Sequence, residues 1–272
     1  MEQKTFGFIG TGNMGGALAR AARRRLEGED ILLANRTKAK AEALAKELGA
    51  SAEKSTYVAA VADYIFLGVK PQMMKDLLEE IGPKLLARWE RKDRFVLVTM
   101  AAGLTIGDIQ GLAGGDYPVI RIMPNTPCSI GEGMVLYTPG PGVTAAEVQV
   151  FLEAMAGAGR FAEIPERLMD AGSAVAGCGP AFVDLFIEAL ADGGVACGLP
   201  RQKALAYAAQ MLKGTASLLL ETGQHPGAMK DAVCSPGGST IAGVRVLEES
   251  GFRGAAMDAV IAALERTREL GR

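Results

Sequence analysis

The chain has 272 residues, a formal net charge of −2 and no long basic run. This length accommodates one large domain or two ordinary ones. The near-neutral charge, without a basic run, gives no sign of a nucleic-acid-binding surface. The cysteines show no CxxC pairing and the only histidine is His225, so we expect reduced thiols and no metal site or disulfide framework. The cysteines are Cys128, Cys178, Cys197 and Cys234.

The beginning of the chain and its most apolar segment both bear on location. Residues 1–4 lead at once into the first motif, so we expect no signal peptide and a cytoplasmic protein. Residues 174–199 are apolar enough to raise the question of a membrane span. Because Asp184, Glu188 and Asp192 interrupt this segment, we expect no span.

A glycine-rich turn follows the first strand-like run. It reads Gly10-Thr11-Gly12-Asn13-Met14-Gly15 and opens an alanine-rich helical stretch, expected at residues 16–25. Gly10 allows a sharp turn off the strand, Gly12 lets the backbone approach a pyrophosphate, and Gly15 lets the helix pack close to the sheet. The helix N-terminus would present free N–H groups and the positive end of its dipole. The sequence therefore predicts a dinucleotide site.

The residues after the second predicted strand favour NADPH. At this place an Asp or Glu would hold the ribose 2′-hydroxyl of NAD, whereas a basic group would accept the 2′-phosphate of NADP. The strand 31–34 is followed by Asn35-Arg36-Thr37-Lys38, and Asp30 precedes the strand at the wrong edge of the sheet. First helical turns favour acidic side chains, so the cations Arg36 and Lys38 indicate a phosphate. We expect NADPH, with NADH as the alternative.

The first part of the chain alternates predicted strands and helices, and the remainder has helical periodicity only. Further strands are expected at 64–69, 95–99, 119–123, 134–138 and 161–164, and helices at 38–48, 73–86 and 145–156. This rhythm predicts an α/β fold, an N-terminal doubly wound Rossmann-type sheet followed by an all-helical domain. We expect a dinucleotide-binding domain over 1–164 and a helical dimerisation and substrate domain over 165–272.

Two glycine-rich interruptions mark the helical part. One is Gly177-Cys178-Gly179-Pro180-Ala181, and the other is Ser235-Pro236-Gly237-Gly238-Ser239-Thr240, which leads into a helix expected at 241–249. N–H groups and hydroxyls at a helix N-terminus form a natural seat for a carboxylate. Plain helix capping by Ser239 or Thr240 would explain the same residues. The local sequence leaves both interpretations open.

The run Ala232-Val233-Cys234-Ser235-Pro236-Gly237-Gly238-Ser239-Thr240-Ile241-Ala242-Gly243 resembles the signature of pyrroline-5-carboxylate reductases, which catalyse the last step of proline synthesis. The resemblance runs the length of the chain, through Val69-Lys70-Pro71, Met100-Ala101-Ala102-Gly103, Met123-Pro124-Asn125-Thr126-Pro127, Gly177-Cys178-Gly179-Pro180 and Gly223-Gln224-His225-Pro226. Several ordered motifs are more specific than any single one. Two residues depart from the family pattern: Cys178 replaces a usual Ser, and Ala232 stands where some relatives have an Asn that touches substrate.

The resemblance implies NADPH-dependent reduction of the cyclic imine 1-pyrroline-5-carboxylate to L-proline. The implied cofactor residues are Ile9, Gly10, Thr11, Gly12, Asn13 and Met14 along the dinucleotide, and Asn35, Arg36 and Thr37 near the 2′-phosphate. Ser55 stands where relatives often have an Asn at the adenosine. Val69, Lys70 and Pro71 follow the third expected strand, and Met100, Ala101 and Ala102 would lie near the nicotinamide. The implied substrate residues are Glu166, Gly238 and Ser239, together with Thr240, whose hydroxyl would reach the ring nitrogen as the catalytic group.

The implied chemistry agrees with the scarcity of histidine. Reducing a ketone usually requires a strong proton donor, whereas a cyclic imine can arrive protonated and electrophilic. Holding the ring against the nicotinamide and anchoring its carboxylate would then supply most of the rate. His225, which precedes Pro226 in a polar turn, is expected to be a surface turn residue.

Two other function classes stay open at the level of the residues. A 3-hydroxyacid dehydrogenase of similar build would use a lysine on a helix of the second domain, and Lys203, Lys213 and Lys230 are available. None of them lies beside a glycine-rich anion turn as Thr240 does. The other class is a non-catalytic NADP-binding sensor or scaffold.

The helical domain is the expected source of self-association. Its apolar stripes, broken at Gly193-Gly194 and Gly198-Leu199-Pro200, are ill suited to a lone helical bundle of this size. The resemblance implies that the helical domains of two chains interleave, so that the Ser235 to Thr240 turn of one chain would complete the site of its partner. The expected partners are a small-molecule substrate and a second copy of the chain, with no nucleic acid and no membrane.

Overall fold

The computed structural model describes residues 4–270, and the chain divides into two compact units. The first unit consists of Met1–Cys178 with Ala263–Arg272, and the second of Gly179–Ala262. The domain boundary expected between residues 164 and 165 remains a prediction.

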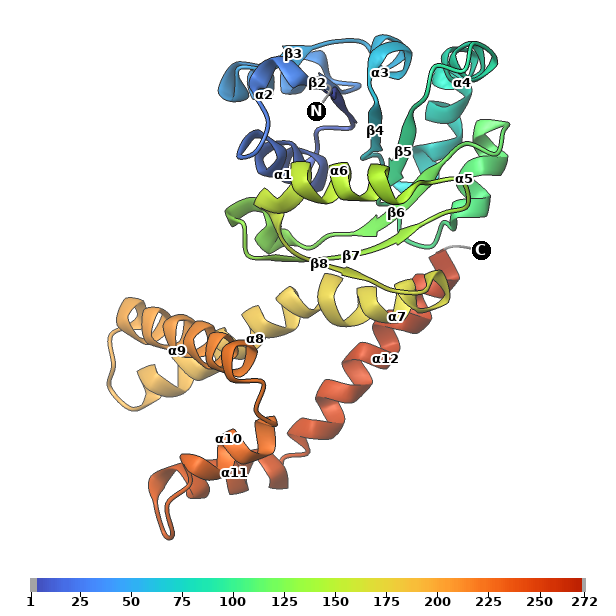
Figure 1. Cartoon of the computed structure of the whole chain (residues 1–272). Coiled ribbons are helices and arrows are strands. Elements are labelled where there is room, and N and C mark those ends of the chain that lie inside the picture. Colours follow the sequence, from blue (N-terminus) through green and yellow to red (C-terminus); the bar gives the residue numbers. More distant parts are fainter. Residues whose placement is uncertain (1–3, 271–272) are drawn as a thin grey trace. The chain divides into compact units, whose positions relative to one another are not determined.

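The described strands of the first unit form one eight-stranded sheet in the order β3-β2-β1-β4-β5-β6-β7-β8 (Figure 1). The strands are β1 (Phe6–Ile9), β2 (Ile31–Ala34), β3 (Ser51–Ala52), β4 (Tyr64–Leu67), β5 (Val96–Thr99), β6 (Val119–Met123), β7 (Gly133–Pro139) and β8 (Gly159–Glu163). β1 to β6 pair in parallel, β7 runs antiparallel to β6, and β8 pairs in parallel with β7. The strand order reverses between β1 and β4, which places a binding crevice at their carboxyl ends.

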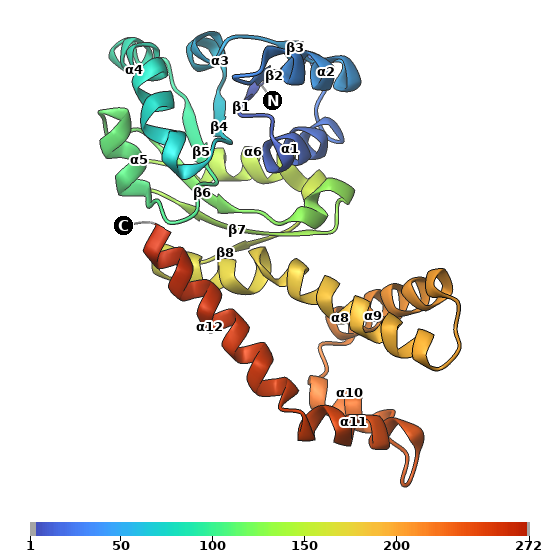
Figure 2. The same ribbon diagram turned by 180° about the vertical axis from the view of Figure 1, so that it is seen from behind.

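Helices cover both faces of this sheet (Figures 1 and 2). They are α1 (Asn13–Arg23), α2 (Lys38–Leu48), α3 (Ser55–Val61), α4 (Met74–Glu90), α5 (Ile106–Ala113), α6 (Ala145–Met155) and α7 (Met169–Gly172), with the 3₁₀ turns η1 (Gly28–Asp30), η2 (Pro71–Met73), η3 (Thr126–Ile130), η4 (Ala156–Ala158) and η5 (Glu166–Leu168). Tyr64 and Phe66 pack in the cluster with α1, α2 and α6, whereas Ile65 and Leu67 pack with α3, α4 and α5. Burial on both faces explains why these strands read as continuous apolar runs.

The expected α/β fold is therefore confirmed, with differences at short elements. The helix expected at 38–48 has those bounds, and the strand expected at 161–164 is β8. The first helix begins at Asn13, earlier than expected, because Gly12 already serves as its N-cap. β3, α3 and α5 were not expected from the sequence. β3 has two residues, and α5 has eight, two of which are glycines, so neither carries a clear periodic signal.

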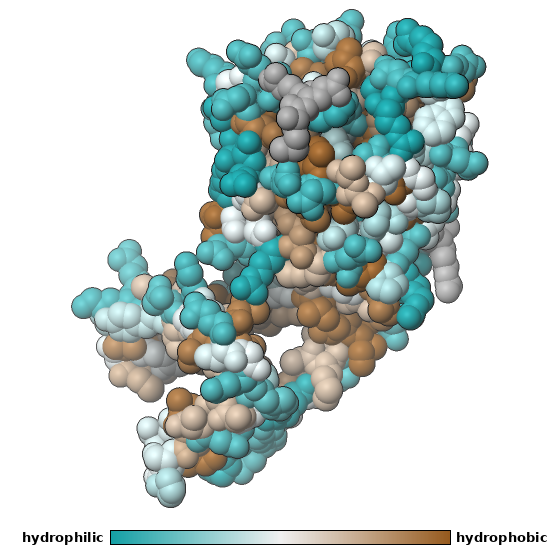
Figure 3. Space-filling model, in the orientation of Figure 1, coloured by the Kyte–Doolittle hydropathy of each residue, from teal (hydrophilic) through white to brown (hydrophobic). Residues whose placement is uncertain are grey.

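The second unit is helical, as the sequence predicts. Its helices are α8 (Gly179–Ala196), α9 (Arg201–Thr222), α10 (Pro226–Ala232), α11 (Ser239–Glu249) and the first part of α12 (Phe252–Leu270). Among its described residues only Ala191, Ala204 and Ala208 are buried. Large apolar side chains are exposed, among them Leu185 and Met257, and apolar surface is visible over these helices in Figure 3. This unit therefore leaves many large apolar side chains exposed and buries only a few small ones.

A π-helix, η6 (Ser173–Gly177), precedes α8, where the sequence predicts an interruption. The side-chain amide of Asn125 donates to the carbonyl of Ala176 at 3.0 Å, which gives that π-helical carbonyl a partner. The helical run Glu166–Ala196 is long and apolar enough to cross a membrane, with 11% of its most apolar window buried. Length and composition alone are weak support for a span, because core helices of soluble proteins pass the same test.

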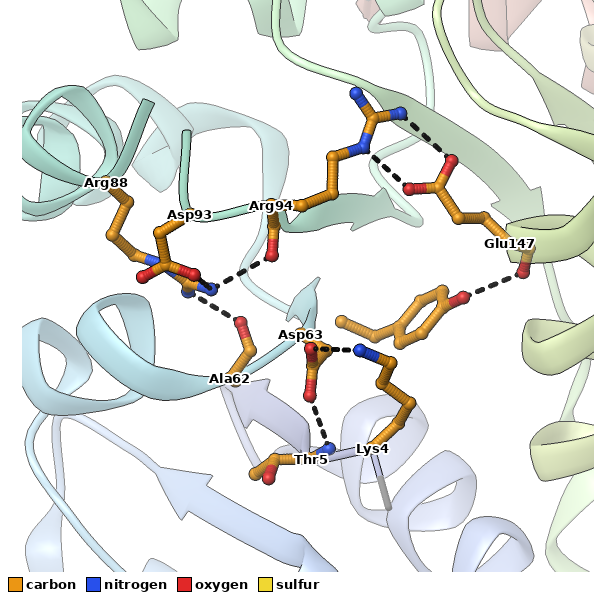
Figure 4. A network of polar contacts seen from close by, with 9 residues as sticks. Lys4, Thr5, Ala62, Asp63, Arg88, Asp93, Arg94 and Glu147 are labelled. Carbon is orange, nitrogen blue, oxygen red and sulfur yellow. Dashed lines mark hydrogen bonds and ion pairs between the residues drawn. The ribbon is translucent and has the colours of Figure 1, made fainter. Parts of the chain in front are cut away.

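A polar network lies at the amino ends of β4 and β5 (Figure 4). Arg88 of α4 is 2% exposed, forms a two-pronged ion pair with Asp93, and donates to the carbonyls of Ala59, Ala62 and Arg94. Its guanidinium also lies over the Phe95 ring at 5.0 Å. These bonds join α3, α4 and the start of β5 around one buried charge.

The neighbouring part of the network joins Arg94 to α6. The Arg94 guanidinium binds Glu147 at 2.7 Å, and the Tyr64 hydroxyl donates to the Glu147 carbonyl. Burial opposes ionisation of Glu147, but hydrogen bonds from Arg94 and Thr144 outweigh it and hold the pKa of this carboxyl below its usual value. Burial, and the nearby Glu147 charge, raise the pKa of Tyr64, so its hydroxyl stays a hydrogen-bond donor.

We expect Arg88→Met to lower the free energy of unfolding by about 2 to 4 kcal/mol, because it leaves buried carbonyls without a donor. Urea titration at a fixed protein concentration measures this loss. Arg91→Met is the matched control, since Arg91 directly follows α4, is exposed and, within residues 4–270, donates only to the Ala87 carbonyl. Equal midpoints for the two variants would contradict a structural role for the Arg88 network.

Candidate functional site

The carboxyl end of β1 is in direct backbone contact with α1 and β4. Gly10 has φ +98°, and a Cβ on it would lie 2.6 Å from the carbonyl carbon of Gly68, which follows β4. A Cβ on Gly15, in the first turn of α1, would lie 2.0 Å from the Gly10 carbonyl oxygen. At Gly12 a Cβ would meet nothing within 4 Å. Two of the motif glycines are thus required by packing, and the third faces open space.

The N-terminus of α1 is suited to an anion. Its N-cap is Gly12, which makes no side-chain hydrogen bond, and its first turn holds no acidic residue. The backbone N–H groups of that turn therefore lack side-chain partners and carry the positive end of the helix dipole. The hydroxyl of Thr11 is buried and has no hydrogen-bond partner within residues 4–270. An open glycine, free amides and an unpartnered buried hydroxyl fit a dinucleotide phosphate.

The turn after β2 is held against the glycine-rich turn by Asn35. Its side-chain oxygen accepts from the Thr11 N–H at 3.2 Å, and its side-chain amide donates to the Thr37 carbonyl at 3.1 Å. Arg36 is exposed and makes no ion pair within the described residues, whereas Lys38 pairs with Glu42 at 2.9 Å. Of these two cations, Arg36 is therefore the one without an ion pair among the described residues.

The other expected cofactor residues follow β3, β4 and β5 on the same edge of the sheet. Val69, Lys70 and Pro71 come after β4, and Pro71 opens η2. Met100, Ala101 and Ala102 come directly after β5, and the buried Ala101 donates its N–H to the Thr99 hydroxyl at 3.4 Å. Ser55 is half-buried and opens α3, which follows β3. Parallel pairing therefore brings these segments to the carboxyl ends of adjacent strands.

Glu166, the expected substrate acid in the first unit, already has protein partners. Its Oε1 accepts from the backbone N–H of Ile106 at 2.7 Å and from the Arg121 guanidinium at 3.4 Å. Arg121 also donates to Asp170 at 2.7 Å. The other oxygen of Glu166 has no hydrogen bond within the described chain, and its side chain is 32% exposed. Glu166 is thus held by one oxygen and presents the other.

The turn before α11 leaves its backbone amides uncapped. The N-cap is Gly238, with no side-chain hydrogen bond, and Ser239 and Thr240 are the first exposed residues of the helix. Capping by the hydroxyl of Ser239 or Thr240, which the sequence left open, is not what the structure has, because both residues lie inside the helix. The Gly237 backbone has φ +67°, which a glycine adopts without strain.

The remaining candidates for a catalytic role, His225 and three lysines, either make local structural contacts or are exposed to solvent. His225 is the exposed N-cap of α10, and its Nδ1 accepts from the Gly227 N–H at 3.0 Å. Lys203 and Lys213 are exposed, and Lys230 pairs with Asp231.

The four cysteines are free thiols, but only Cys128 is buried, where burial raises the pKa of its thiol. Within residues 4–270 no group of three or more His, Cys, Asp or Glu could hold a metal.

Sequence reasoning missed three residues that shape the first unit's site. Gly68 contacts the glycine-rich turn, and Arg121 and Asp170 hold Glu166 and the segment around it. Arg121 had a readable signal, since a cation within the apolar run Val119–Met123 needs a buried partner. Asp170 had none, because an acid in a helical segment is ordinarily solvated.

Two family models match the chain. One, described as pyrroline-5-carboxylate reductase dimerisation, matches residues 166–270, and the other, described as NADP oxidoreductase coenzyme F420-dependent, matches residues 5–98. The first match covers the helical part of the chain, and the second covers the N-terminal part that contains the glycine-rich turn.

Similar proteins cover nearly the whole chain. The chain is 41% identical to a pyrroline-5-carboxylate reductase of Escherichia coli, over 99% of both sequences. It is 40% identical to that of Glycine max, over 99% of this chain and 97% of the relative. A crystal structure of Plasmodium falciparum pyrroline carboxylate reductase with NADP bound has a TM-score of 0.88 at 32% identity, covering all of both chains. The chain therefore belongs to the pyrroline-5-carboxylate reductase family.

Proposed function

We propose that the chain reduces 1-pyrroline-5-carboxylate to L-proline with NADPH, as the final step of proline biosynthesis. Family membership over the full length supports the reaction. The observation that supports NADPH as the cofactor is the open, uncapped N-terminus of α1, together with Arg36, a cation without an ion pair in the described chain. Turnover of 1-pyrroline-5-carboxylate, compared with 3-hydroxyisobutyrate, tests the proposal: reduction of the imine alone is expected, and oxidation of the hydroxyacid alone would contradict it.

The dinucleotide would be held by the segments at the carboxyl ends of β1, β2, β4 and β5. The α1 amides and the Thr11 hydroxyl would bind the pyrophosphate, and Asn35, Arg36 and Thr37 would surround the 2′-phosphate. Val69 to Pro71 would lie along the dinucleotide, and Met100 to Ala102 would lie against the nicotinamide. Ser55 would contact the adenosine. When bound, NADPH supplies the hydride for the reduction.

The substrate would contact Glu166 and the turn before α11, with the turn of one chain completing the site of its partner. The uncapped amides at Gly238 and Ser239 would receive the substrate carboxylate, because such amides favour an anion. The Thr240 hydroxyl would hydrogen-bond the ring nitrogen. Glu166 would face the ring with the oxygen that has no protein partner. A protonated imine is already electrophilic, so these residues need only fix its orientation.

Assembly, partners and location complete the proposal. Self-association would proceed through the helical domain, since the dimerisation model matches residues 166–270 and the second unit leaves large apolar side chains exposed. We propose residues 1–164 as the dinucleotide-binding domain and 165–272 as the helical dimerisation and substrate domain. The protein would act in the cytoplasm, on a small molecule and with no nucleic acid or membrane partner.

Arg36→Asp tests the 2′-phosphate contact. We expect the KM for NADPH to rise roughly 10- to 150-fold, because the change removes a charge-assisted contact and introduces repulsion. The KM for NADH should change little, since that cofactor has no 2′-phosphate. Lys46→Asp is the control, because it makes the same charge reversal at an exposed position near the end of α2, the helix that follows the Arg36 turn. Parallel changes in both KM values for Arg36→Asp would remove Arg36 from the phosphate site.

Thr240→Val tests the substrate contact. The variant keeps the side-chain shape and loses the hydroxyl, so the reduction step should slow roughly 5- to 150-fold, about 1 to 3 kcal/mol of transition-state stabilisation. NADPH affinity should be unchanged, and the melting temperature should also stay the same, because Gly238 and not Thr240 occupies the N-cap position of α11.

Two further variants make the Thr240 result specific. Thr240→Ser retains the hydroxyl and should keep much of the activity. Thr215→Val removes an exposed helical hydroxyl that bonds only within α9, and should leave turnover intact. Normal turnover in Thr240→Val would end its catalytic assignment.

A further inference from the structure

Arg121 is a buried charge at the carboxyl side of the sheet. It lies within β6 between apolar residues, and its side chain is 2% exposed. Its Cα pairs in register with Thr99, the last residue of β5. Arg121 therefore stands directly beside the point where the chain leaves β5 and enters the loop 100–105. A cation buried this completely is retained only with charged or hydrogen-bonded partners.

Its guanidinium connects β6 to the segment after β8. One nitrogen donates to Glu166 of η5 at 3.4 Å and another donates to Asp170 of α7 at 2.7 Å. The third, Nε, has no hydrogen-bond partner within the described residues. Both carboxylates are partly exposed, with 32% and 29% of their side chains accessible. One buried arginine thus orients two partly exposed acids.

Glu166 extends this connection to the loop after β5. The Glu166 oxygen that accepts a hydrogen bond from Arg121 also accepts one, at 2.7 Å, from the backbone N–H of Ile106, the first residue of α5. The capping box of Thr105 and Asp108 is internal to α5 and fixes only its first turn. Glu166 comes from sixty positions along the chain and fixes where that turn lies against β6. Loop 100–105 is therefore held by β5 at one end and by Glu166 at the other.

This loop lies on the nicotinamide side of the crevice. In a doubly wound sheet each half of the sheet binds one half of the dinucleotide, and the first half, with the glycine-rich turn, takes the adenosine half. The loop after β5 belongs to the other half. We propose that Arg121 is a positioning residue that, through Glu166, fixes the loop supporting the nicotinamide ring and thereby aligns it for reduction of the imine. This inference rests on the proposed function for the identity of the cofactor.

Arg88 provides a matched control within the same unit. It is also an arginine, also 2% exposed, and also holds a carboxylate and backbone carbonyls. Its partners Ala62 and Arg94 precede β4 and β5, at the opposite ends of these strands. Loss of either arginine removes a buried network, but only loss of Arg121 reaches the loop 100–105.

The test compares Arg121→Met with Arg88→Met in the full-length protein. The dissociation constants of NADPH and of 2′-phospho-ADP-ribose, which lacks the nicotinamide, are measured by calorimetry, with kcat, KM and melting temperature alongside. Both variants should melt earlier. Arg121→Met alone should weaken NADPH about 5- to 10-fold while 2′-phospho-ADP-ribose changes less than about twofold. It alone should also lower kcat roughly 10- to 100-fold, because small misplacements of reacting groups are costly.

Arg121→Lys is the conservative variant and the safeguard if Arg121→Met fails to fold. Lysine keeps the charge but lacks the planar guanidinium that reaches both carboxylates. We therefore expect partial recovery of kcat and of the NADPH affinity relative to that of 2′-phospho-ADP-ribose. Equal weakening of NADPH and 2′-phospho-ADP-ribose would overturn the proposal, as would equal loss of kcat in the Arg121 and Arg88 variants. A wild-type protein that does not reduce the imine would refute the proposed function, whereas the ratio of the two ligand affinities would still test Arg121.

Discussion

The first unit depends on one close backbone contact, in which the end of β1, the first turn of α1 and the end of β4 meet without side chains between them. Gly10, Gly15 and Gly68 form this contact, and a Cβ on any of them would fall 2.0 to 2.6 Å from a backbone atom. Such distances exclude every other residue, since backbone cannot yield as a flexible side chain can. The contact fixes the direction in which α1 leaves the sheet, and hence where its amides point.

The anion site results from that contact and from the absence, within the described chain, of side-chain hydrogen bonds to the first amides of α1. Gly12 offers no side chain to cap α1, and no acid occupies its first turn, so the amides keep their capacity for an outside partner. Asn35 uses its side-chain oxygen and its amide on the backbone of Thr11 and Thr37, which fixes the β2 turn against the β1 turn. Arg36 is then placed next to this joint without an ion pair of its own in the described chain.

The sequence predicted what periodicity and turn chemistry encode, and missed what depends on distant partners. The apolar runs predicted the buried parallel strands, and the glycine spacing predicted the dinucleotide turn. The short α5 escaped because two glycines dilute its pattern, and its capping box was the available signal. Pairing of Lys38 with Glu42, and of Glu166 with Arg121, cannot be read from one position, because each partner alone resembles an ordinary charged residue. At α11, only the backbone conformation shows that Gly238 is the N-cap residue and that no described side chain caps the helix. The sequence alone could not distinguish a capped helix from an anion-binding turn.

The two units bury apolar surface to very different degrees, and this difference links folding to assembly. The sheet places Phe66 and Leu67 in separate buried clusters on its two faces. In the second unit, by contrast, Leu185 and Met257 are 68% and 61% exposed. Covering one such side chain is worth roughly 1.5 to 3 kcal/mol, so several of them together rival the whole stability of a small domain. A helical unit that gains so much from a second copy has a stability that rises with protein concentration, because association favours only the folded chain. If a second copy covers these side chains, folding and self-association of the helical part become one equilibrium, whereas the sheet already carries its core within a single chain.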